Sequence, residues 1–153
     1  MDIIFWRHAE ALEAIEGQED LLRELTSKGE KQASKMGSWL DRQLPEGVRV
    51  MSSPAKRAEQ TVRALGRKYK VKSELLPEAS ALELLEAVGW PNSKMSVVVV
   101  GHQPVIGQCV AHLLGLPDQG LSVRKGAVWW LRSRLRDGIP QTVVVSVQSP
   151  ELI

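Results

Sequence analysis

The sequence predicts an α/β fold, a three-layer sandwich in which helices flank a mostly parallel central sheet. Short apolar runs alternate with segments of helical length along the chain. One run, SVVVV at 96–100, consists largely of β-branched residues, which is typical of a strand buried on both faces. No internal repeat or low-complexity tract interrupts the alternation, and 153 residues suit one domain, which we expect to span 1–153.

The chain should begin with a strand, a loop and a long helix. The apolar run DIIFW at 2–6 predicts a buried strand. Residues 9–24 are acidic and weakly patterned, which is consistent with a loop or a short helix. A helix is expected from 26 or 27 to about 44, because Ser27 and Glu30 fit a capping box.

The next segment should contain a strand, a helix and a further strand. Residues 48–51 (VRVM) predict the second strand. Ser53 is the expected N-cap of a helix that has Pro54 at its first position and runs to about Tyr69. Residues 71–76 are expected to form a third strand.

The second half of the chain continues the alternation. Ser80 and Glu83 form a capping box ahead of LELLEAV, and 89–92 reads as a loop. The buried strand 96–100 then precedes a helix that Pro104 opens and Gly115 closes.

Two late strands complete the predicted sheet. They are 127–132, which is rich in tryptophan, and 142–147, with a turn around Asp137-Gly138 between them. In the helix before them, Cys109 is expected to be a buried thiol and His112 a structural or surface residue.

Composition excludes several classes of function. The formal net charge is +2, from 20 basic and 18 acidic residues, so we expect neither a nucleic acid nor a membrane as partner. No cysteine–histidine spacing suits a metal, and we expect no cofactor. The N-terminus lacks the features of a signal peptide, and no apolar run approaches the roughly 20 residues of a membrane span. These features predict a soluble cytoplasmic protein.

Basic residues directly follow three of the predicted strands. Arg7 and His8 come after the first strand, Arg57 belongs to the segment 52–57 after the second, and His102 follows SVVVV and Gly101. In open α/β sheets ligands bind beyond the carboxyl ends of the strands, and parallel strands place these ends at one edge. We therefore expect two histidines and two arginines to meet in one pocket.

Arg57 is placed to bind an anion at a helix start. With Ser53 as N-cap, Arg57 falls in about the first turn, and helical side chains lean toward the N-terminus. Free N–H groups and the helix dipole favour an anion there, and a guanidinium binds phosphate oxygens with two donors. Each motif alone is weak, since an Arg-His pair occurs by chance and a helix arginine is usually solvated. Their joint placement predicts a phosphoryl pocket.

These motifs together resemble the histidine phosphatase superfamily, which has the phosphoglycerate-mutase-like fold. The matching residues are Arg7-His8, Ser53-Pro54, Arg57-Ala58, Gln60-Thr61 and Gly101-His102. The short chain, with Arg23 before Leu25-Thr26 and Gly29, looks like the small SixA-like phosphohistidine phosphatase branch.

The resemblance implies metal-independent covalent catalysis. His8 would be the nucleophile, and Arg7, Arg57 and His102 would hold the phosphoryl oxygens. The residue types agree with this on physical grounds, because a neutral imidazole can attack phosphorus while cationic groups stabilise the transition state. Neighbouring arginines also disfavour the imidazolium form of His8.

Two departures from the family pattern stand out. Ala9 replaces the usual glycine after Arg-His, which would cost about 1 kcal/mol if that position required a positive φ. The long insertion that carries a general acid in larger relatives is absent, and Glu10 and Glu78 are the nearest acidic candidates.

Three functions fit these residues. The first is a phosphatase acting on phosphohistidine in a protein of the phosphotransfer type, the second a phosphatase of small phosphomonoesters, and the third a non-catalytic phospho-ligand binding module. The missing acid favours the first, because phosphohistidine expels an imidazole, a far weaker base than the alkoxide of an alkyl ester. The nucleophile position of His8 disfavours the third.

Overall fold

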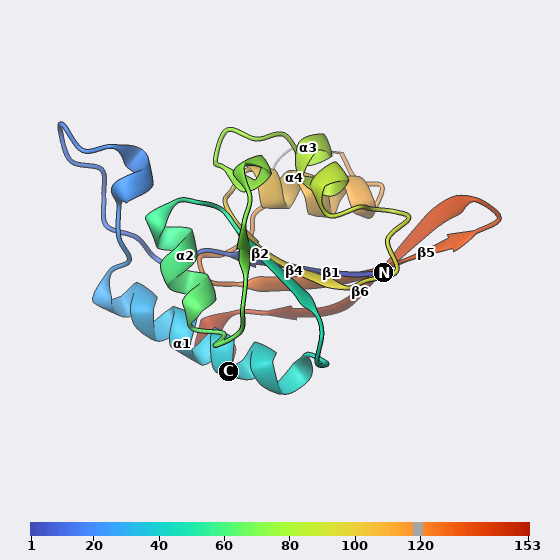
Figure 1. The fold of residues 1–153 in the computed structure, drawn as a ribbon, viewed down its shortest axis with the longest axis horizontal. Coiled ribbons are helices and arrows are strands. Elements are labelled where there is room, and N and C mark those ends of the chain that lie inside the picture. The colour runs from blue at the N-terminus through green and yellow to red at the C-terminus, as the bar shows by residue number, and fades with distance from the viewer. Residues whose placement is uncertain (118–120) are drawn as a thin grey trace.

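The computed structural model describes residues 1–117 and 121–153, whose strands form one mixed sheet (Figure 1). Its strand order is β3-β2-β4-β1-β5-β6. The strands are β1 (Asp2–Arg7), β2 (Arg49–Ser52), β3 (Lys70–Val71), β4 (Val97–Gly101), β5 (Val128–Arg136) and β6 (Ile139–Gln148). The helices are α1 (Ser27–Gln43), α2 (Lys56–Arg63), α3 (Ala81–Ala87) and α4 (Val105–Leu113), with 3-10 turns η1 (Asp20–Leu22), η2 (Ser73–Leu75) and η3 (Pro150–Leu152).

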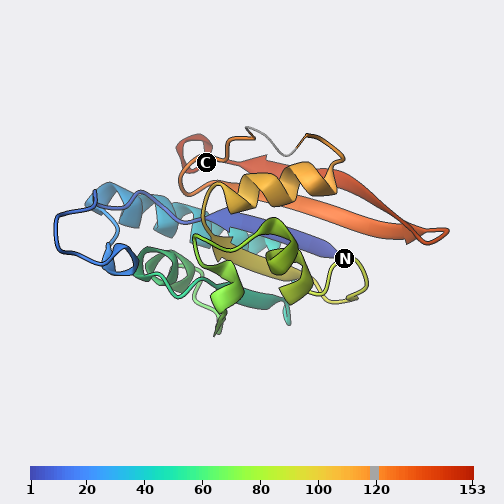
Figure 2. The same cartoon turned by 90° about the horizontal axis from the view of Figure 1, so that it is seen from above.

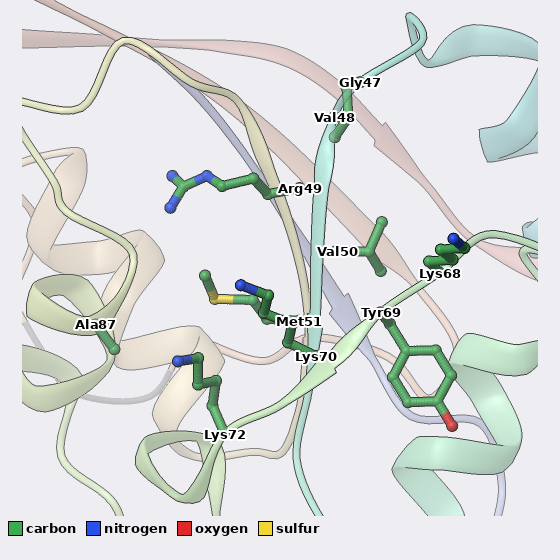
Figure 3. A pocket seen from close by; sticks show the side chains of 10 residues that line it. All are labelled: Gly47, Val48, Arg49, Val50, Met51, Lys68, Tyr69, Lys70, Lys72 and Ala87. Carbon is green, nitrogen blue, oxygen red and sulfur yellow. The ribbon is translucent and has the colours of Figure 1, made fainter.

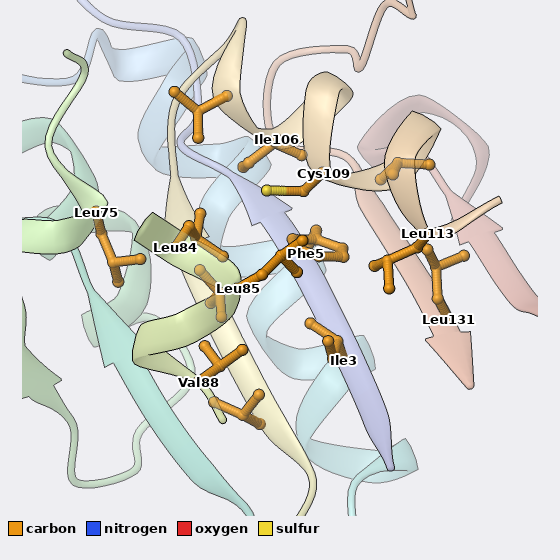
Figure 4. Packing of buried hydrophobic residues seen from close by; sticks show 14 of the residues in the cluster. Ile3, Phe5, Leu75, Leu84, Leu85, Val88, Ile106, Cys109, Leu113 and Leu131 are labelled. Atoms are coloured by element: carbon orange, nitrogen blue, oxygen red, sulfur yellow. The ribbon is translucent and has the colours of Figure 1, made fainter. Parts of the chain in front are cut away.

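The predicted α/β sandwich is confirmed. Helices α3 and α4 cover one face of the sheet, and α1 and α2 cover the other (Figures 1 and 2). Alternate residues of β1 face the two layers: Ile3 and Phe5 pack with α3 and α4, while Ile4 and Trp6 pack with α1 and α2. Figure 4 shows the first of these clusters around Phe5. Both faces of β1 are therefore dry, which explains its unbroken apolar run.

The register of the parallel strands builds one functional edge. Strands β3, β2, β4 and β1 run parallel, and Arg7 pairs with Gly101 at the carboxyl ends of β1 and β4. The His8 amide donates to the Gly101 carbonyl at 3.0 Å, and the Ser53 amide donates to Val100 at 3.0 Å. The residues that follow three different strands are thus held side by side.

Helix α1 has a different cap from the one expected. Thr26 is the N-cap, and its side chain accepts a hydrogen bond from the Gly29 amide at 2.9 Å. The predicted Ser27–Glu30 capping box is wrong, since the helix starts one residue after Thr26. Gly29 lies against the Glu10 carbonyl, where a Cβ would overlap with the backbone. This close approach ties the start of α1 to the segment after β1.

The second helix and third strand are shorter than predicted. Helix α2 starts at Lys56 rather than directly after Ser53, whose hydroxyl instead accepts from the Ala55 amide at 3.2 Å. The helix is over by Gly66, whose φ of 74° favours glycine. Strand β3 has two residues, because the chain then enters a 3-10 turn that buries Leu75.

The final strands form a hairpin that is longer than predicted. Strands β5 and β6 are antiparallel, and their turn places Asp137 and Gly138 at φ values of 53° and 77°, as a tight hairpin requires. Cys109 is buried in α4, as expected, whereas His112 is exposed and lies edge-on to Trp90. Within residues 1–117 and 121–153, no helix has the length and apolar character needed to cross a membrane.

Candidate active site

A polar pocket of about 280 Å³ opens at the carboxyl edge of the parallel strands. All four predicted residues, Arg7, His8, Arg57 and His102, line it, and Arg23 joins them. The two imidazole rings are neighbours, with their centroids 5.1 Å apart and their planes tilted by 59°. The pocket therefore combines two histidines with three arginines from segments that are distant in the sequence.

The His8 ring is fixed in one tautomer. Its Nδ1 lies 2.7 Å from the carbonyl oxygen of Ala9, which can only accept a hydrogen bond, so Nδ1 carries the proton. The lone pair of the neutral ring is then on Nε2. The main chain of His8 is also held in place, because its carbonyl accepts a hydrogen bond from the Gly126 amide at 3.1 Å.

The environment keeps His8 neutral. Burial, with only 9% of the residue exposed, lowers the pKa of His8 to about 4, and the charges of Arg57, Arg7 and Arg23 act in the same direction. The hydrogen bond to the Ala9 carbonyl opposes these effects without overcoming them. At neutral pH His8 is therefore an unprotonated imidazole among cations, which suits a nucleophile.

His102 is held by a serine that the sequence placed at a helix cap. Its Nε2 lies 2.8 Å from the hydroxyl of Ser53, and both residues are buried. Burial lowers the pKa of His102 to about 3, with His8 and Arg57 contributing in the same direction. A phosphoryl oxygen can only accept, so contact through Nδ1 of His102 requires the tautomer in which Ser53 donates to Nε2.

Arg7, which is half-buried, and Arg57, which is buried, are each anchored to a main-chain carbonyl. Arg7 donates from Nη1 to the Val123 carbonyl at 2.8 Å, and Arg57 donates from Nη1 to the Asp20 carbonyl at 2.8 Å. Arg57 also donates from Nη2 to the Asp20 carboxylate at 3.0 Å. In each guanidinium the protein binds the outer end through Nη atoms, while the Nε–H is left without a hydrogen-bond partner.

Four buried side-chain nitrogens in the described part of the chain have no hydrogen-bond partner. Three of them belong to this pocket: Nε of Arg7, Nε of Arg57 and Nδ1 of His102. An unpaired buried polar atom costs about 1–3 kcal/mol, so three in one place indicate a function that uses them. An oxyanion bound in the pocket would offer several acceptor oxygens to these nitrogens.

Neither of the two acidic candidates lines the pocket. Glu10 does not line the pocket, because its carboxylate accepts from the Thr26 hydroxyl at 2.8 Å at the start of α1. Glu78 is exposed and does not line the pocket either, although Pro77 does. Glu13, which the sequence argument did not single out, does line the pocket.

Two further residues of the site were missed by the sequence argument. Lys125 lines the pocket from the loop before β5, and Asp20 binds both Arg57 and Arg23. Lys125 lies in a turn and Asp20 begins the short 3-10 turn η1, and neither segment has a periodicity that assigns a direction to a side chain. The one available signal for Asp20 was its spacing of three residues from Arg23.

The residues around Ala9 explain why alanine is accepted there. Ala9 does not have a positive φ, and its side chain is fully buried. The cost expected for a strained alanine therefore does not arise. Its amide donates to the Thr61 hydroxyl at 3.1 Å, and that hydroxyl donates to the Arg57 carbonyl at 2.7 Å. Thr61 thus joins the His8 segment to the Arg57 helix.

A larger cavity of about 660 Å³ lies elsewhere, along β2 and β3 at the outer edge of the sheet (Figure 3). Arg49, Lys70 and Lys72 are among its lining residues, and the lining contains no histidine, cysteine or carboxylate. The smaller pocket, where two histidines and three arginines meet, is therefore the candidate active site.

The fold and the site together define an α/β protein with a polar pocket of two histidines and three arginines at the ends of its parallel strands. Residues 3–82 match the model of the histidine phosphatase superfamily (branch 1), and the chain belongs to this superfamily. It is 34% identical over 125 residues, 74% of each chain, to phosphohistidine phosphatase SixA of Escherichia coli K12. It is 31% identical over 131 residues to a SixA homolog of Haemophilus influenzae, covering 75% of this chain and 78% of that protein.

A solved structure supports the same relationship. The protein histidine phosphatase SixA complexed with tungstate has a TM-score of 0.80 to this chain at 28% identity, with 99% of both chains covered. The fold is therefore the SixA-like phosphoglycerate-mutase fold, as the motifs predicted.

Proposed function

We propose that this protein is a metal-independent phosphatase that removes the phosphoryl group from phosphohistidine on proteins, through a covalent phospho-His8 intermediate. The observation that carries this proposal is the set of three unpartnered nitrogens around the His8 ring. They are hydrogen-bond donors for the equatorial oxygens of a transferring phosphoryl group. The similarity to SixA supports phosphohistidine as the substrate class.

The first chemical step uses the free lone pair of His8. Nε2 of His8 attacks phosphorus, and the P–N bond to the substrate breaks with its electrons moving to the departing imidazole. When the other ring nitrogen of the substrate is protonated, the leaving group departs as neutral imidazole and requires no enzyme acid. The Nδ1–H of His8 continues to donate its hydrogen bond to the Ala9 carbonyl, and this bond stabilises the positive charge on the ring of the intermediate.

Water completes the cycle. A water molecule attacks phosphorus of the phospho-His8 intermediate, the P–Nε2 bond breaks, and His8 leaves as the neutral imidazole because Nδ1 has kept its proton. Inorganic phosphate and one proton from water are released. Arg7, Arg57 and His102 hold the same oxygens in both steps, so one set of donors serves both transition states.

The surroundings of the pocket favour a macromolecular substrate. The segment between β1 and α1 projects from the carboxyl edge of the sheet (Figure 1) and contributes Ala11 and Glu13 to the pocket. The same segment exposes Leu12, Ile15 and Leu22 by 52%, 65% and 53%. Apolar side chains exposed beside a polar pocket are typical of a surface that contacts a protein.

The test is a comparison of specificity constants. We expect the highest kcat/KM for a histidine-phosphorylated phosphotransfer domain, a lower value for p-nitrophenyl phosphate and the lowest for glycerate or sugar phosphates. Leu12→Ser together with Ile15→Ser should raise KM for the protein and leave that for p-nitrophenyl phosphate unchanged. The reverse order of substrates would overturn the assignment.

Glu13 supports a second candidate, a phosphatase of small phosphomonoesters. Glu13 lines the pocket, where its protonated carboxyl group would donate a proton to an alkoxide leaving group. In that case Glu13→Gln should lower kcat for glycerate or sugar phosphates by about 100-fold or more and affect p-nitrophenyl phosphate less. Under the phosphohistidine assignment, Glu13→Gln should leave turnover of the phosphoprotein nearly unchanged.

A further inference from the structure

We propose that Asp20 is a positioning residue for the phosphoryl site, which orients Arg57 and joins it to Arg23 and the projecting segment. This inference rests on the proposed function and assigns a role within the same site. Asp20 itself does not line the pocket, so it would act through the arginines.

Asp20 determines which edge of Arg57 faces the ligand. Its main-chain carbonyl and its carboxylate oxygen Oδ2 accept from Nη1 and Nη2 of Arg57, at 2.8 and 3.0 Å. These two bonds hold the outer end of the guanidinium. The Nε–H is left without a partner, and Nη2 keeps a second hydrogen. The edge of the guanidinium formed by Nε and Nη2 can therefore donate two parallel hydrogen bonds to a phosphoryl group.

The other carboxylate oxygen of Asp20 brings a third arginine to the pocket. Oδ1 accepts from Nε of Arg23 at 3.0 Å, and Arg23 donates from Nη1 to the Leu12 carbonyl at 2.8 Å. Three bonds therefore run from Arg57 through Asp20 and Arg23 to the part of the loop that bears the exposed leucine. A protein substrate that contacts this loop would therefore affect the orientation of Arg57 through these bonds.

The charge state of Asp20 agrees with lasting ion pairs to Arg57 and Arg23. Burial alone would raise the pKa of Asp20, but the hydrogen bond and charge of Arg57 hold that pKa below its ordinary value, and Arg23 adds to this. Asp20 is therefore ionised at neutral pH. Its side chain is 54% exposed, whereas that of Arg57 is only 4% exposed. The carboxylate offsets the charge of a nearly buried guanidinium from the solvent side.

The side chain of Asp20 lies on the solvent side of both ion pairs, so we expect its loss to affect catalysis more than stability. Exposed pairs are worth about 0–1 kcal/mol because water and salt screen them. A misplacement of about 1 Å at a transition-state contact, in contrast, costs about 100-fold in rate. Loss of Asp20 should therefore separate activity from stability.

The chain offers a matched control for this test. Asp41 also holds an arginine, accepting from Nε of Arg67 at 2.8 Å, and it lies away from the pocket. The side-chain exposures of Arg67 and Asp41 are 21% and 55%, close to the 21% and 54% of Arg23 and Asp20. Asp41→Asn thus removes a comparable charge without touching Arg57.

The experiment compares Asp20→Asn, Asp20→Glu and Asp41→Asn in thermal unfolding, turnover and anion binding. For Asp20→Asn we expect kcat/KM to fall by about 10- to 100-fold, mainly through kcat. Inhibition by vanadate, which mimics the five-coordinate transition state, should weaken in parallel, and the affinity for inorganic phosphate should weaken less. Asp20→Glu should restore part of the activity, and Asp41→Asn should match the wild type.

Two results would overturn the proposal. Unchanged vanadate inhibition and turnover in Asp20→Asn would show that Arg57 needs no tie. Tighter vanadate binding in Asp20→Asn would show that Asp20 competes with the ligand for Arg57. If the wild type turned over no phosphorylated substrate while Asp20→Asn still weakened vanadate binding, the proposed function would fail and the role of Asp20 in the anion site would stand.

Discussion

The carboxyl edge of the parallel strands and the β5–β6 hairpin are opposites in what they bury. At the carboxyl edge the polar side chains of His8, Arg57 and His102 are buried, and three nitrogens lack partners. Along β6 the reverse holds: Val143 and Val147 are exposed by 59% and 44%. The edge thus bears the cost of buried polar groups, while the hairpin leaves apolar side chains in water.

Strand direction explains this difference. Strands β1, β2 and β4 are parallel, so their carboxyl ends and the residues that follow them meet in one place. Strands β5 and β6 are an antiparallel extension whose turn points away from the pocket (Figure 1). Strand β5 supports β1 through Asp2, which accepts from Arg132 Nε at 2.7 Å and Trp130 Nε1 at 3.0 Å. Functional changes should therefore concentrate at the edge.

The largest expected effect is that of His8→Ala. This variant lacks the proposed nucleophile, so turnover of every phosphorylated substrate should fall to background. Wild-type enzyme quenched with acid-free denaturant during turnover should carry an alkali-stable, acid-labile phosphoryl group on His8. Measurable single-turnover phosphate release by His8→Ala, or label on another residue, would refute covalent catalysis by His8.

The next largest effect is expected for Arg7 and Arg57. Arg57→Ala and Arg7→Ala each remove a charge-assisted contact to the transferred group, so kcat/KM should fall by about 100- to 1,000-fold. Arg57→Lys should recover little, because a lysine cannot present a planar edge. Steady-state kinetics with p-nitrophenyl phosphate measure these changes; a loss below tenfold for either alanine variant would remove that arginine from the oxyanion set.

The sequence predicted the main site residues because each lies close to a strand end. Arg7 ends a strand, and His8 and His102 follow strands, that are recognisable from apolar runs, and the register of the parallel strands brings the three residues together. Arg57 was found through the short connection after β2, although its helix starts later than expected. Local patterns thus suffice where the position of a side chain follows from the sheet.

The remaining residues depend on contacts that are remote in the sequence. The residues next to Ser53 predict that it caps a helix, but its hydroxyl forms a hydrogen bond with His102, which is 49 residues away. Asp20 is placed by Arg57, 37 residues away, and in the acidic loop only its spacing of three residues from Arg23 sets it apart from the other carboxylates. The short β3 strand was overestimated for a related reason, because burial of Leu75 decides the path of the chain there.

A moderate effect is expected from pH. Because burial lowers the pKa of His8 to about 4, the nucleophile should remain neutral down to about pH 5, where an ordinary histidine would be mostly protonated. Titration of the ring protons of His8 by NMR should give a midpoint near 4, and Arg57→Ala should raise it. A midpoint near 6.5 in the wild type would contradict the electrostatic account.

The same shift predicts how stability depends on pH. The folded-state pKa of His8 lies below its unfolded value, so the unfolded chain binds more protons between about pH 6.5 and 4. The free energy of unfolding should therefore decrease as the pH falls through this range. Urea unfolding of the wild type and His8→Ala at several pH values should show a smaller decrease in the variant.

The smallest effect is expected in the hairpin, where valine-to-threonine substitution has a matched control in β4. Val143 of β6 is 59% exposed, so the new hydroxyl of Val143→Thr meets water, and stability should change by less than about 0.5 kcal/mol. Val99 of β4 is fully buried among apolar neighbours, and Val99→Thr buries a hydroxyl at a cost of about 1–3 kcal/mol. Urea unfolding measures both changes, and kcat/KM of Val143→Thr should stay within twofold of the wild type. If Val143→Thr lowered the free energy of unfolding by more than about 1 kcal/mol, this face of β6 would be covered in solution. The contrast between the hairpin and the carboxyl edge of the parallel strands would then fail.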